Sequence, residues 1–512
     1  MEGMAVTEIV RATRASLQFF VPEAWLTVGL LVLLVLDLGL RDDRKRSVLP
    51  WTAFGIVLGA TLWAVPLLGQ APTEIFSGLL VVDPFGTYLK IVIGVATLLT
   101  VLVSVRNREL AGYGVGEYYV LLLGLTLACM LLVGAVHFVM ILLALEMVSV
   151  SSYLLVAYRK AHAASVEAGL KYIVFGAAAT GAMLYAVSWI YGLTGTLYLA
   201  EVARRLQTMA ISPGWLVIML LLSAGLAFKI AAVPFHFWAP DAYQGAATPV
   251  AALLTVAPKA AGFAMLVRIF YHGFSVYRPE AEAWEAIPGL GWPLFLSIVA
   301  AVTMTWGNTV ALWQKNIKRL LAYSSISHAG YMLMAVLTGT REGLQALLFY
   351  VVAYMVMNMG AFFTVLALSD VTDRYEDIGA YQGLAARFPE LTWAMAFFLL
   401  SLAGIPPFIG FFGKFFLFAA AIRGGWTWLA VLAVLNSVIS LFYYVYIIKN
   451  MVIERPGEFG PVSSWGPAYR TVLVLGVAVL VLGILFSPIY GWTARSSSLV
   501  EAFGMALRAM GK

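Results

Sequence analysis

Four ionisable side chains lie inside long apolar stretches, and they are of the types that bind and release protons. Glu146, Lys229, Lys259 and Lys414 are each flanked on both sides by apolar residues. A charge at the centre of a bilayer costs roughly 2.5–3.5 kcal/mol on insertion scales, and such residues are interpreted first as parts of ion or proton pathways. Together these four residues predict a proton relay.

An amine or carboxyl group in such a place can carry protons because its surroundings set its proton affinity. Burial lowers the pKa of a lysine and raises that of a carboxyl group, whereas a neighbouring carboxylate favours the charged lysine. Moving that carboxylate, or changing its charge, would switch the lysine between holding and releasing a proton. Two structural interpretations compete with the relay. A lysine near a helix end can extend its amine to the headgroups, and Glu146 with Lys229 can form a static ion pair that only fixes helix packing.

Lys171 and two histidines extend this set of candidates. Lys171 lies three residues into its predicted helix, where an amine that reaches the headgroups is the main alternative. His236 lies in a proline-interrupted segment and His328 in a serine-rich one. Each histidine is a candidate relay, and a hydrogen-bonded packing role is an equal alternative. Asp241, just past Pro240, is predicted to cap or hydrogen-bond its segment rather than carry protons.

The composition requires lipid as the solvent for most of the chain. Of 512 residues, 62% are hydrophobic and 11% are charged, whereas a soluble domain has about a quarter charged residues. Stretches of about 20 apolar residues, enough to span the hydrocarbon core as a helix, recur throughout. We therefore predict an all-α polytopic membrane protein with about fourteen transmembrane helices.

The predicted spans alternate with short connectors along the chain. Their approximate limits are 22–40, 49–69, 86–105, 118–135, 137–157, 168–192, 214–236, 247–272, 290–312, 319–338, 344–369, 392–420, 427–449 and 470–491. Two shorter stretches, 73–85 and 496–510, are predicted to lie along the membrane surface.

Prolines are expected to break helices in mid-membrane. Pro234 interrupts the seventh predicted helix, Pro406 and Pro407 interrupt the twelfth, and Pro258 precedes Lys259 in the eighth. Proline removes one backbone donor and clashes with the preceding turn, which frees carbonyl groups. Such carbonyls could anchor water between proton carriers, because broken backbone at this depth is tolerated only against protein or water.

Helices 7 and 12 are each the fourth in a run of five, helices 4–8 and 9–13. Corresponding interruptions in two halves are typical of inverted-repeat transporters, so this pattern alone predicts two inverted five-helix repeats. The predicted organisation is a single integral membrane domain over 1–512, which comprises three N-terminal helices (1–105), the first repeat (118–272), the second repeat (290–449) and a C-terminal helix and tail (450–512).

Basic residues gather in the connectors, so the net charge of +6 does not indicate nucleic-acid binding. Connectors that follow helices 1, 3, 5, 9, 11 and 13 hold most of them, among them Arg41, Arg106, Arg159, Lys315 and Arg455. Loops rich in lysine and arginine stay on the cytoplasmic side. These connectors are therefore predicted to face the cytoplasm, and both termini the opposite side.

The cysteine and histidine content argues against a metal or redox centre in this chain. Cys129 is the only cysteine, so an internal disulfide and an all-cysteine iron–sulfur site are excluded. The five histidines are not at metal-ligand spacing. Nor is there a glycine-rich dinucleotide fingerprint in a βαβ context. We therefore expect no cofactor and no metal.

Three segments resemble the antiporter-like membrane subunits of respiratory complex I, the NADH–quinone oxidoreductase. Residues 232–250 read AVPFHFWAPDAYQGAATPV, and 256–261 continue with VAPKAA. Residues 318–331 read KRLLAYSSISHAGY, and 403–414 read AGIPPFIGFFGK. The likeness extends over about 100–490, and the family has fourteen helices.

The resemblance implies a role for each candidate. Glu146 would be the helix 5 carboxylate paired with Lys229, and Lys259 the central lysine on helix 8. Lys414 would lie toward the outer exit, and Lys171 matches a helix 6 lysine of the family. In having a lysine at position 414 the chain resembles subunit N, because subunit M usually has glutamate at this position. The absence of a long lateral helix distinguishes the chain from subunit L.

The family further implies a proton-translocating subunit that uses the energy of NADH oxidation and quinone reduction elsewhere in the complex. NADH, FMN, iron–sulfur clusters and quinone would then bind partner subunits. Expected partners are the antiporter-like subunit M, the small membrane subunits and lipid of a bacterial inner membrane. Two alternatives stay open: a subunit of a Na⁺/H⁺ antiporter or membrane-bound hydrogenase of the same ancestry, and a spacer whose charges only pack. Lys414 favours complex I.

Overall fold

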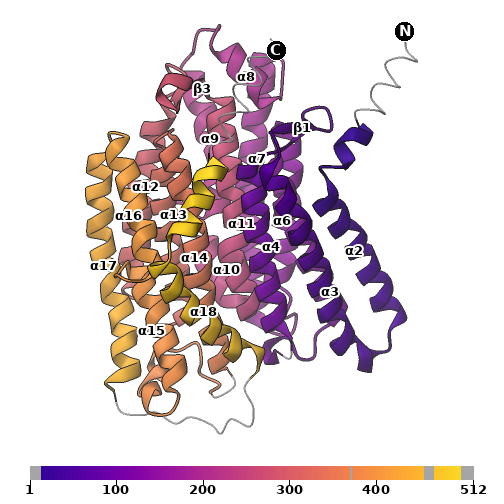
Figure 1. The fold of residues 1–512 in the computed structure, drawn as a ribbon, viewed down its shortest axis with the longest axis vertical. Helices are drawn as coiled ribbons and strands as arrows, with labels where there is room; N and C mark the ends of the chain where they lie inside the picture. Colours follow the sequence, from indigo (N-terminus) through magenta and orange to yellow (C-terminus); the bar gives the residue numbers. More distant parts are fainter. Residues whose placement is uncertain (1–12, 106, 370–371, 455–465, 498–512) are drawn as a thin grey trace.

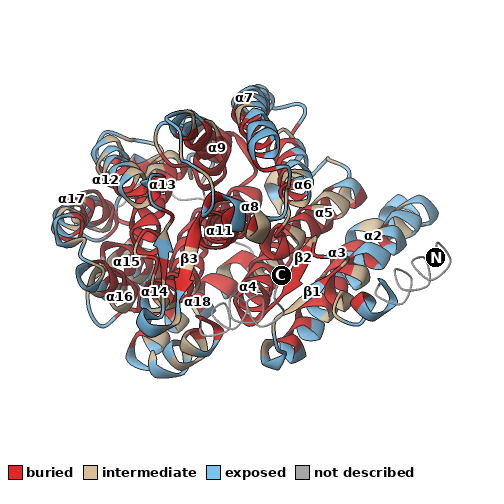
Figure 2. Ribbon diagram, turned by 90° about the horizontal axis from the view of Figure 1, so that it is seen from above, coloured by how far each residue is buried: buried red, intermediate tan, exposed pale blue. Residues whose placement is uncertain are grey.

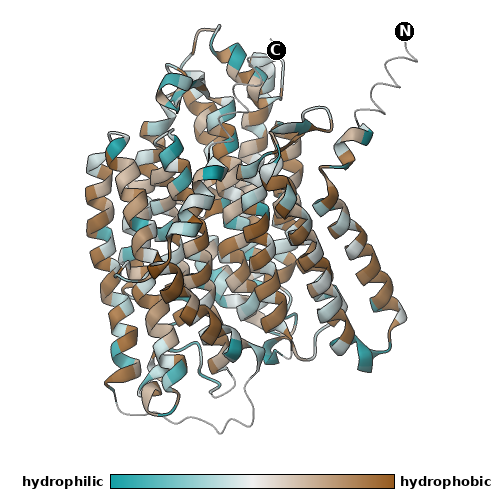
Figure 3. Cartoon of the chain, viewed as in Figure 1, coloured by the Kyte–Doolittle hydropathy of each residue, from teal (hydrophilic) through white to brown (hydrophobic). Residues whose placement is uncertain are grey.

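The computed structural model describes residues 13–105, 107–369, 372–454 and 466–497, and its long elements are α-helices (Figure 1). Arg106, Arg455 and the part of the predicted surface stretch from residue 498 onward lie outside these ranges. The helices are apolar along their lengths, and hydrophilic residues gather toward their ends (Figure 3). Within the described ranges, 11 helices are long and apolar enough to cross a membrane. The chain is therefore a mostly helical, polytopic membrane protein, as predicted.

The helices occur in the predicted order. Their bounds are α2 (Val21–Gly39), α3 (Asp42–Ala64), α4 (Pro84–Ser104), α5 (Val115–Gly134), α6 (Phe138–Val156), α7 (Ala163–Thr194), α8 (Leu199–Leu206), α9 (Gly214–Ile230), α10 (Trp238–Gly245), α11 (Thr248–Val267), α12 (Trp292–Ala311), α13 (Ile317–Val336), α14 (Arg341–Leu368), α15 (Pro389–Ala403), α16 (Ile409–Arg423), α17 (Thr427–Val452) and α18 (Pro467–Ile484). The amphipathic helix α8 was not predicted, because it is too short to give a membrane-spanning signal.

A break in the helix lies within each of the two spans that contain the interrupting prolines. The span 214–236 consists of α9, which ends at Ile230, and α10 begins only at Trp238. The span 392–420 is divided between α15, which ends at Ala403, and α16, which begins at Ile409. Each gap contains a cis X–Pro peptide bond. The two interruptions leave helix termini in the middle of the bundle.

The predicted break at Pro258 is wrong. Pro258 lies inside α11, which continues to Val267. A proline inside a helix removes the hydrogen bond to the carbonyl four residues earlier, here that of Leu254. The Tyr243 hydroxyl donates to this carbonyl at 3.5 Å. Tertiary packing therefore supplies a donor at this position, and the helix runs through the proline.

Two small antiparallel hairpins lie at the same end of the bundle as α8 (Figure 1). Strands β1 (Thr73–Ile75) and β2 (Leu80–Val82) form the first, and β3 (Ser275–Arg278) and β4 (Ala283–Ala286) the second. The stretch 73–85, predicted to lie along the membrane surface, is thus largely a hairpin.

The core of the bundle surrounds α11 and α14, whose residues are almost all buried (Figure 2). On the peripheral helices, by contrast, large apolar side chains are exposed. Examples are Leu38 near the end of α2 and Phe442 on α17. In water these would be a liability, whereas in a bilayer they contact lipid or neighbouring chains. This distribution supports the interpretation of composition given above.

The basic connectors meet at one end of the bundle. Arg108 donates to the Ser369 carbonyl at 2.9 Å, which joins the connectors after the third and eleventh predicted spans. Lys318, just after the ninth, forms a 3.1 Å ion pair with Glu376. We call this the inner end, and the end with the hairpins the outer end.

Helices α12 and α13 approach so closely that one glycine is required. A Cβ built on Gly307 would lie 2.7 Å from the Ser327 nitrogen and 2.8 Å from the Tyr323 oxygen. Both are backbone atoms, which cannot rotate away. In contrast, Gly181 on α7 has nothing within 4 Å of its Cβ position.

We therefore expect Gly307→Ala to lower the stability of the detergent-solubilised protein by about 1–3 kcal/mol, because the added methyl group overpacks the contact. Gly181→Ala is the matched control and should not be destabilising. Thermal unfolding followed by circular dichroism measures both. Equal unfolding midpoints for the two variants would contradict this account of the α12–α13 contact.

Candidate functional site

Lys259 lies halfway along α11 in the centre of the bundle. Its side-chain Nζ donates to the carbonyl oxygen of Ser325 at 2.7 Å and to its Oγ at 2.6 Å. The ring of Tyr354 on α14 is centred 6.0 Å from the same Nζ. Only 2% of Lys259 is exposed, so its amine is held inside the protein and does not reach toward a helix end.

His328 lies one turn beyond Ser325 on α13 and connects three helices. Its Nδ1 is 2.5 Å from the hydroxyl of Tyr350 on α14, and its Nε2 is 3.3 Å from the hydroxyl of Tyr444 on α17. The Tyr444 hydroxyl is also 2.5 Å from Oγ of Ser324. Each of these groups can both donate and accept, which a proton relay requires.

Lys414 uses a carbonyl that the second helix break has freed. Its Nζ donates to the Ala403 carbonyl, at the last residue of α15, at 3.1 Å. It also donates to Ser437 Oγ on α17 at 2.8 Å, and it lies 4.9 Å from the ring centre of Tyr331. The rings of Tyr331 and His328 are 5.6 Å apart. Lys414 therefore adjoins the histidine network.

Lys229, in the last turn of α9, packs against the helix that carries Lys259. It is buried, and its Nζ donates to Ser149 Oγ on α6 at 3.3 Å. On α11, a Cβ built on Gly262 would lie 3.2 Å from Cγ of Lys229. Gly262 is one turn from Lys259, so the two lysines belong to neighbouring positions of one buried polar row.

Glu146 does not pair directly with Lys229. Its side chain is exposed on the outside of α6, and within the described residues it has no ion-pair partner inside 4.0 Å. The alternative to the relay, a static Glu146–Lys229 ion pair, is therefore not formed among the described residues. The reason is helix rotation: Ser149, three residues on, faces Lys229 in its place.

Lys171 is partly exposed and belongs to a different group of charges. Its Nζ contacts Glu167 at 2.8 Å and Asp241 at 3.0 Å. Asp241 also pairs with Arg319 of α13 at 2.5 Å. Asp241, predicted to hydrogen-bond the broken segment, thus fastens α10 to α7 and α13.

His236 lies in the first break but outside the lysine row. Its ring is buried against Phe237, at 4.3 Å, and Trp306, at 6.0 Å. Its Nδ1 has no hydrogen-bond partner among the described residues. His236 and His328 were equal candidates in the sequence, but their surroundings in the structure differ. His328 lies among the relay candidates, whereas His236 packs among aromatic rings.

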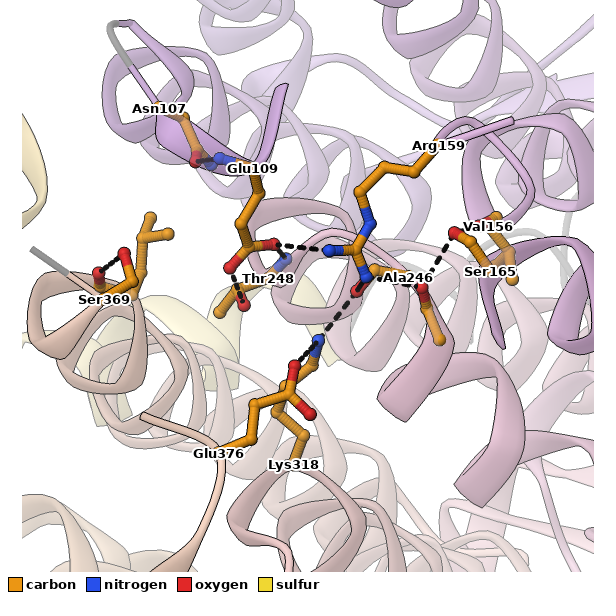
Figure 4. Close-up of polar contacts among 12 residues, drawn as sticks. Asn107, Glu109, Val156, Arg159, Ser165, Ala246, Thr248, Lys318, Ser369 and Glu376 are labelled. Carbon is orange, nitrogen blue, oxygen red and sulfur yellow. Dashed lines mark hydrogen bonds and ion pairs between the residues drawn. The ribbon is translucent and has the colours of Figure 1, made fainter. Parts of the chain in front are cut away.

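A charged network surrounds the turn between α10 and α11 at the inner end of the bundle (Figure 4). The Glu109 carboxylate accepts from the Thr248 backbone N–H and hydroxyl, both at 2.6 Å, at the start of α11. Arg159 donates to the Gly245 carbonyl at the end of α10, at 2.9 Å, and lies 4.0 Å from Glu109. These groups bind the backbone termini that lie on either side of Ala246.

Lys318 completes this network from α13. Its Nζ donates to the Ala246 carbonyl at 2.7 Å and pairs with Glu376 (Figure 4). Arg159 and Glu376 also line a polar cavity of about 560 Å³. In the sequence, Arg159 and Lys318 indicate only which side of the membrane their connectors face. Their position beside the turn at 245–247 follows from contacts between connectors that are far apart in the chain, which the sequence does not show.

The hydroxyl groups of the row carry no clear signal in the sequence. Nothing in the local sequence distinguishes Tyr350, Tyr444 and Ser437 from ordinary residues of apolar helices. The available signal was weak, because a tyrosine in a membrane helix is common and only its tertiary neighbours show what its hydroxyl contacts.

No group of three or more His, Cys, Asp and Glu side chains in the described ranges could hold a metal ion. Cys129 is buried, and the strands form only two separate hairpins, not a βαβ unit.

Comparison with known proteins places the chain among redox-driven and antiporter membrane subunits. The family model described as "NADH:quinone oxidoreductase/Mrp antiporter, TM" matches residues 135–440. The chain is 39% identical over 501 residues to NADH-quinone oxidoreductase subunit N of Anaeromyxobacter, covering 94% of this chain and 96% of the relative. It is 38% identical over 519 residues to subunit N of Chlorobium chlorochromatii, with 99% of each covered.

Solved structures agree in fold. A chain of respiratory complex I from Thermus thermophilus is 32% identical, with a TM-score of 0.76 over 92% of this chain and 98% of that one. A chain of the Mrp complex from Dietzia has a TM-score of 0.81 over 96% of this chain and 99% of that one. At 22% identity, the latter likeness concerns the fold alone.

The Glu376–Lys318 pair gives the inner network a dependence on pH. Burial by itself raises the pKa of Glu376, but the Lys318 ammonium and the Asn316 amide bring it below the ordinary value of 4.5. A carboxyl group with a lowered folded-state pKa contributes stability above its unfolded pKa, and this contribution is lost as the pH falls through the folded value.

We therefore expect the thermal unfolding midpoint of the protein to decrease as the pH is lowered below 4.5. The decrease should be steeper than that of Glu376→Gln, which lacks this titrating carboxyl group. Glu74→Gln, at an exposed position of β1, is the control and should follow the unmodified protein. Parallel pH profiles for all three proteins would disprove the role of this pair.

Proposed function

Because the chain belongs to the NADH:quinone oxidoreductase/Mrp antiporter transmembrane family, we infer that its buried lysine row carries protons. The chain is an antiporter-like membrane subunit of NADH–quinone oxidoreductase, a proton-translocating complex. It is thus a component of a translocase. We propose that NADH, FMN, iron–sulfur clusters and quinone bind partner subunits, as the family resemblance implies.

The relay that we propose runs through Lys229, Lys259, His328 and Lys414. The single observation that carries it is the continuity of the row. Each lysine donates to a serine hydroxyl. The Lys229 side chain packs beside Gly262, one turn from Lys259 on α11. Ser325, which accepts from Lys259, is one turn from His328, and the Tyr331 ring lies between His328 and Lys414. Three amines buried at such cost without a direct carboxylate partner are not explained by helix packing.

Serines and carbonyls are suited to this task because they hold an amine in either charge state. A serine hydroxyl accepts from an ammonium, and it can donate to the neutral amine by rotating. The carbonyls of Ser325 and Ala403 accept a hydrogen bond from either form, and the bond from the ammonium is the stronger. A proton added at one lysine repels the next proton, so charge moves along the row in steps.

We propose that protons enter this row from the inner end. The cavity beside Arg159 and Glu376 provides polar surface there. The network at Gly245 and Ala246 would separate this cavity from the buried row until its ion pairs open. Lys171, paired with Asp241 at the same break, would act on this network, and His236 would have a packing role.

We also propose an internal symmetry for the bundle. The fourteen predicted spans, with the breaks at Pro234 and at Pro406–Pro407 in equivalent places, would form two inverted repeats over 118–272 and 290–449. The inner end would face the cytoplasm of a bacterial cell, and the described outer end its periplasm.

Glu146 supports a proposal about partners. A carboxylate at the middle of an exposed apolar helix face is unfavourable in lipid, and Leu143 and Met147 beside it are also exposed. We propose that a neighbouring membrane subunit covers this face of α6 and pairs with Glu146. Subunit M and the small membrane subunits are the candidates. The carboxylate would then sense charge in the neighbour and act on Lys229 through Ser149.

A cation/proton antiporter of the same fold is the remaining alternative. Purification of the complex separates the two functions. Flavin and iron–sulfur absorbance in the complex supports NADH–quinone oxidoreductase, whereas Na⁺/H⁺ exchange without redox centres supports the antiporter.

Lys259→Met tests the relay directly. Loss of a positioned acid–base group slows proton transfer by about a hundredfold or more. We therefore expect vesicles with the assembled variant complex to take up fewer protons per NADH oxidised. Lys160→Met, in an exposed connector, is the control and should pump normally. Uptake at the full ratio by an assembled Lys259→Met complex would rule out the relay.

Glu146→Leu tests the covered face. If a partner charge pairs with Glu146, leaving that charge unpaired costs about 3–5 kcal/mol. The neighbour should then be lost from the purified complex, as measured by mass spectrometry of its subunits. Met147→Leu changes an adjacent exposed side chain and should retain the neighbour. Should Glu146→Leu keep every subunit in full amount, α6 faces lipid instead.

A further inference from the structure

A second line of polar side chains runs along α4, outside the lysine row. Thr87, Lys90, Thr97 and Ser104 recur at intervals of three or seven residues, so they lie on one face of the helix. All four are buried. The face extends over about 26 Å at 1.5 Å per residue, close to the thickness of the hydrocarbon core.

The charged member of this face pairs with the first turn of α2. Lys90 Nζ lies 2.6 Å from Oε1 of Glu23, and the two side chains are only 4% and 2% exposed. The other carboxylate oxygen, Oε2 of Glu23, is buried without a hydrogen-bond partner among the described residues. A buried carboxylate oxygen left without a donor is costly. It is also the atom that can accept a proton.

Hydroxyl groups from neighbouring helices complete the line. Gly94, one turn after Lys90, leaves room for Thr61 of α3, whose Oγ1 would lie 2.1 Å from a Cβ at that glycine. Oγ1 of Thr97 is 3.0 Å from Oγ1 of Thr126 on α5. Each of the last two hydroxyls also lies within hydrogen-bond distance of a carbonyl one turn earlier. They can therefore exchange donor and acceptor roles by rotation.

Both ends of the line have the features that a path needs. At the inner end, Ser104 lies 2.8 Å from the hydroxyl of Tyr118, and both line a cavity of about 300 Å³. At the outer end, Oγ1 of Thr87 is buried without a hydrogen-bond partner in the described part of the chain. The line thus begins at a cavity and ends one turn beyond a protonatable pair.

We infer that the α4 line, from Ser104 to the Glu23–Lys90 pair, is a second proton path through this subunit. A proton that arrives from the inner cavity binds Oε2 of Glu23, which converts the carboxylate to the acid and leaves the Lys90 ammonium unpaired. Transfer of that proton past Thr87 restores the ion pair. No electron moves and no other bond changes.

The pair also prevents the line from being an open leak. A fixed ammonium repels an incoming proton, as cationic side chains do in pores that exclude protons. The line conducts only when the proton neutralises Glu23 or when α2 and α4 separate. The competing explanation is a static ion pair that ties α2 to α4, with hydroxyls that only satisfy their own helices.

Thr97→Val with Thr126→Val distinguishes these explanations, because it removes two hydroxyls at nearly constant volume and leaves the ion pair intact. The measurement uses the whole complex in sealed vesicles, with proton uptake and NADH oxidation recorded together. We expect fewer protons per NADH than in the unmodified complex. Thr364→Val, on α14, removes a buried hydroxyl of the same kind away from the line and should leave the ratio unchanged.

Glu23→Gln is a second test variant for the same measurement. It should also lower the number of protons taken up per NADH oxidised. An unchanged ratio in the double valine variant would overturn the inference, whether or not Glu23→Gln assembles. The inference depends on the proposed function only because protons are the transported ion. Lys259→Met reports on the lysine row separately. If only Lys259→Met loses protons, the relay stands and the α4 path fails.

Discussion

The cost of holding an amine in a water-poor interior is the constraint on which the rest of this structure depends. Each of the three lysines of the row must find acceptors within the protein, since neither lipid nor an aliphatic side chain can provide them. Ser149, Ser325 and Ser437 provide hydroxyls, and helix carbonyls provide the remainder. The Ser325 carbonyl lies within the continuous helix α13, whereas the Ala403 carbonyl is available because α15 ends at that residue.

The breaks therefore have different uses in the two halves. In the second, the end of α15 gives its Ala403 carbonyl to Lys414 within the row. In the first, the short helix α10 that follows the break ends at Gly245, and the carbonyls of Gly245 and Ala246 bind Arg159 and Lys318 outside the row. The same backbone device thus stabilises a candidate proton carrier in one place and a charged closure in the other.

The isolated chain leaves one requirement unmet. Glu146 lies on an exposed apolar face, where an unpaired carboxylate is costly in lipid. In the proposed assembly a neighbouring subunit would cover this face. The charge that adjusts the proton affinity of Lys229 would then be shared with that neighbour, which offers a route for coupling to redox chemistry in other subunits.

The sequence alone determined the membrane class, the order of the spans, the two broken helices and the depth of Lys229, Lys259 and Lys414. These follow from local composition, since apolar length, proline and isolated charge need no knowledge of neighbours. It could not determine which side of a helix faces which partner. Tertiary structure decided that Ser149 rather than Glu146 faces Lys229, that His328 and not His236 adjoins the row, and that Tyr243 allows α11 to pass through Pro258. The physical reason is that hydrogen bonds between helices depend on rotation and close approach, which residues far apart in the chain set together.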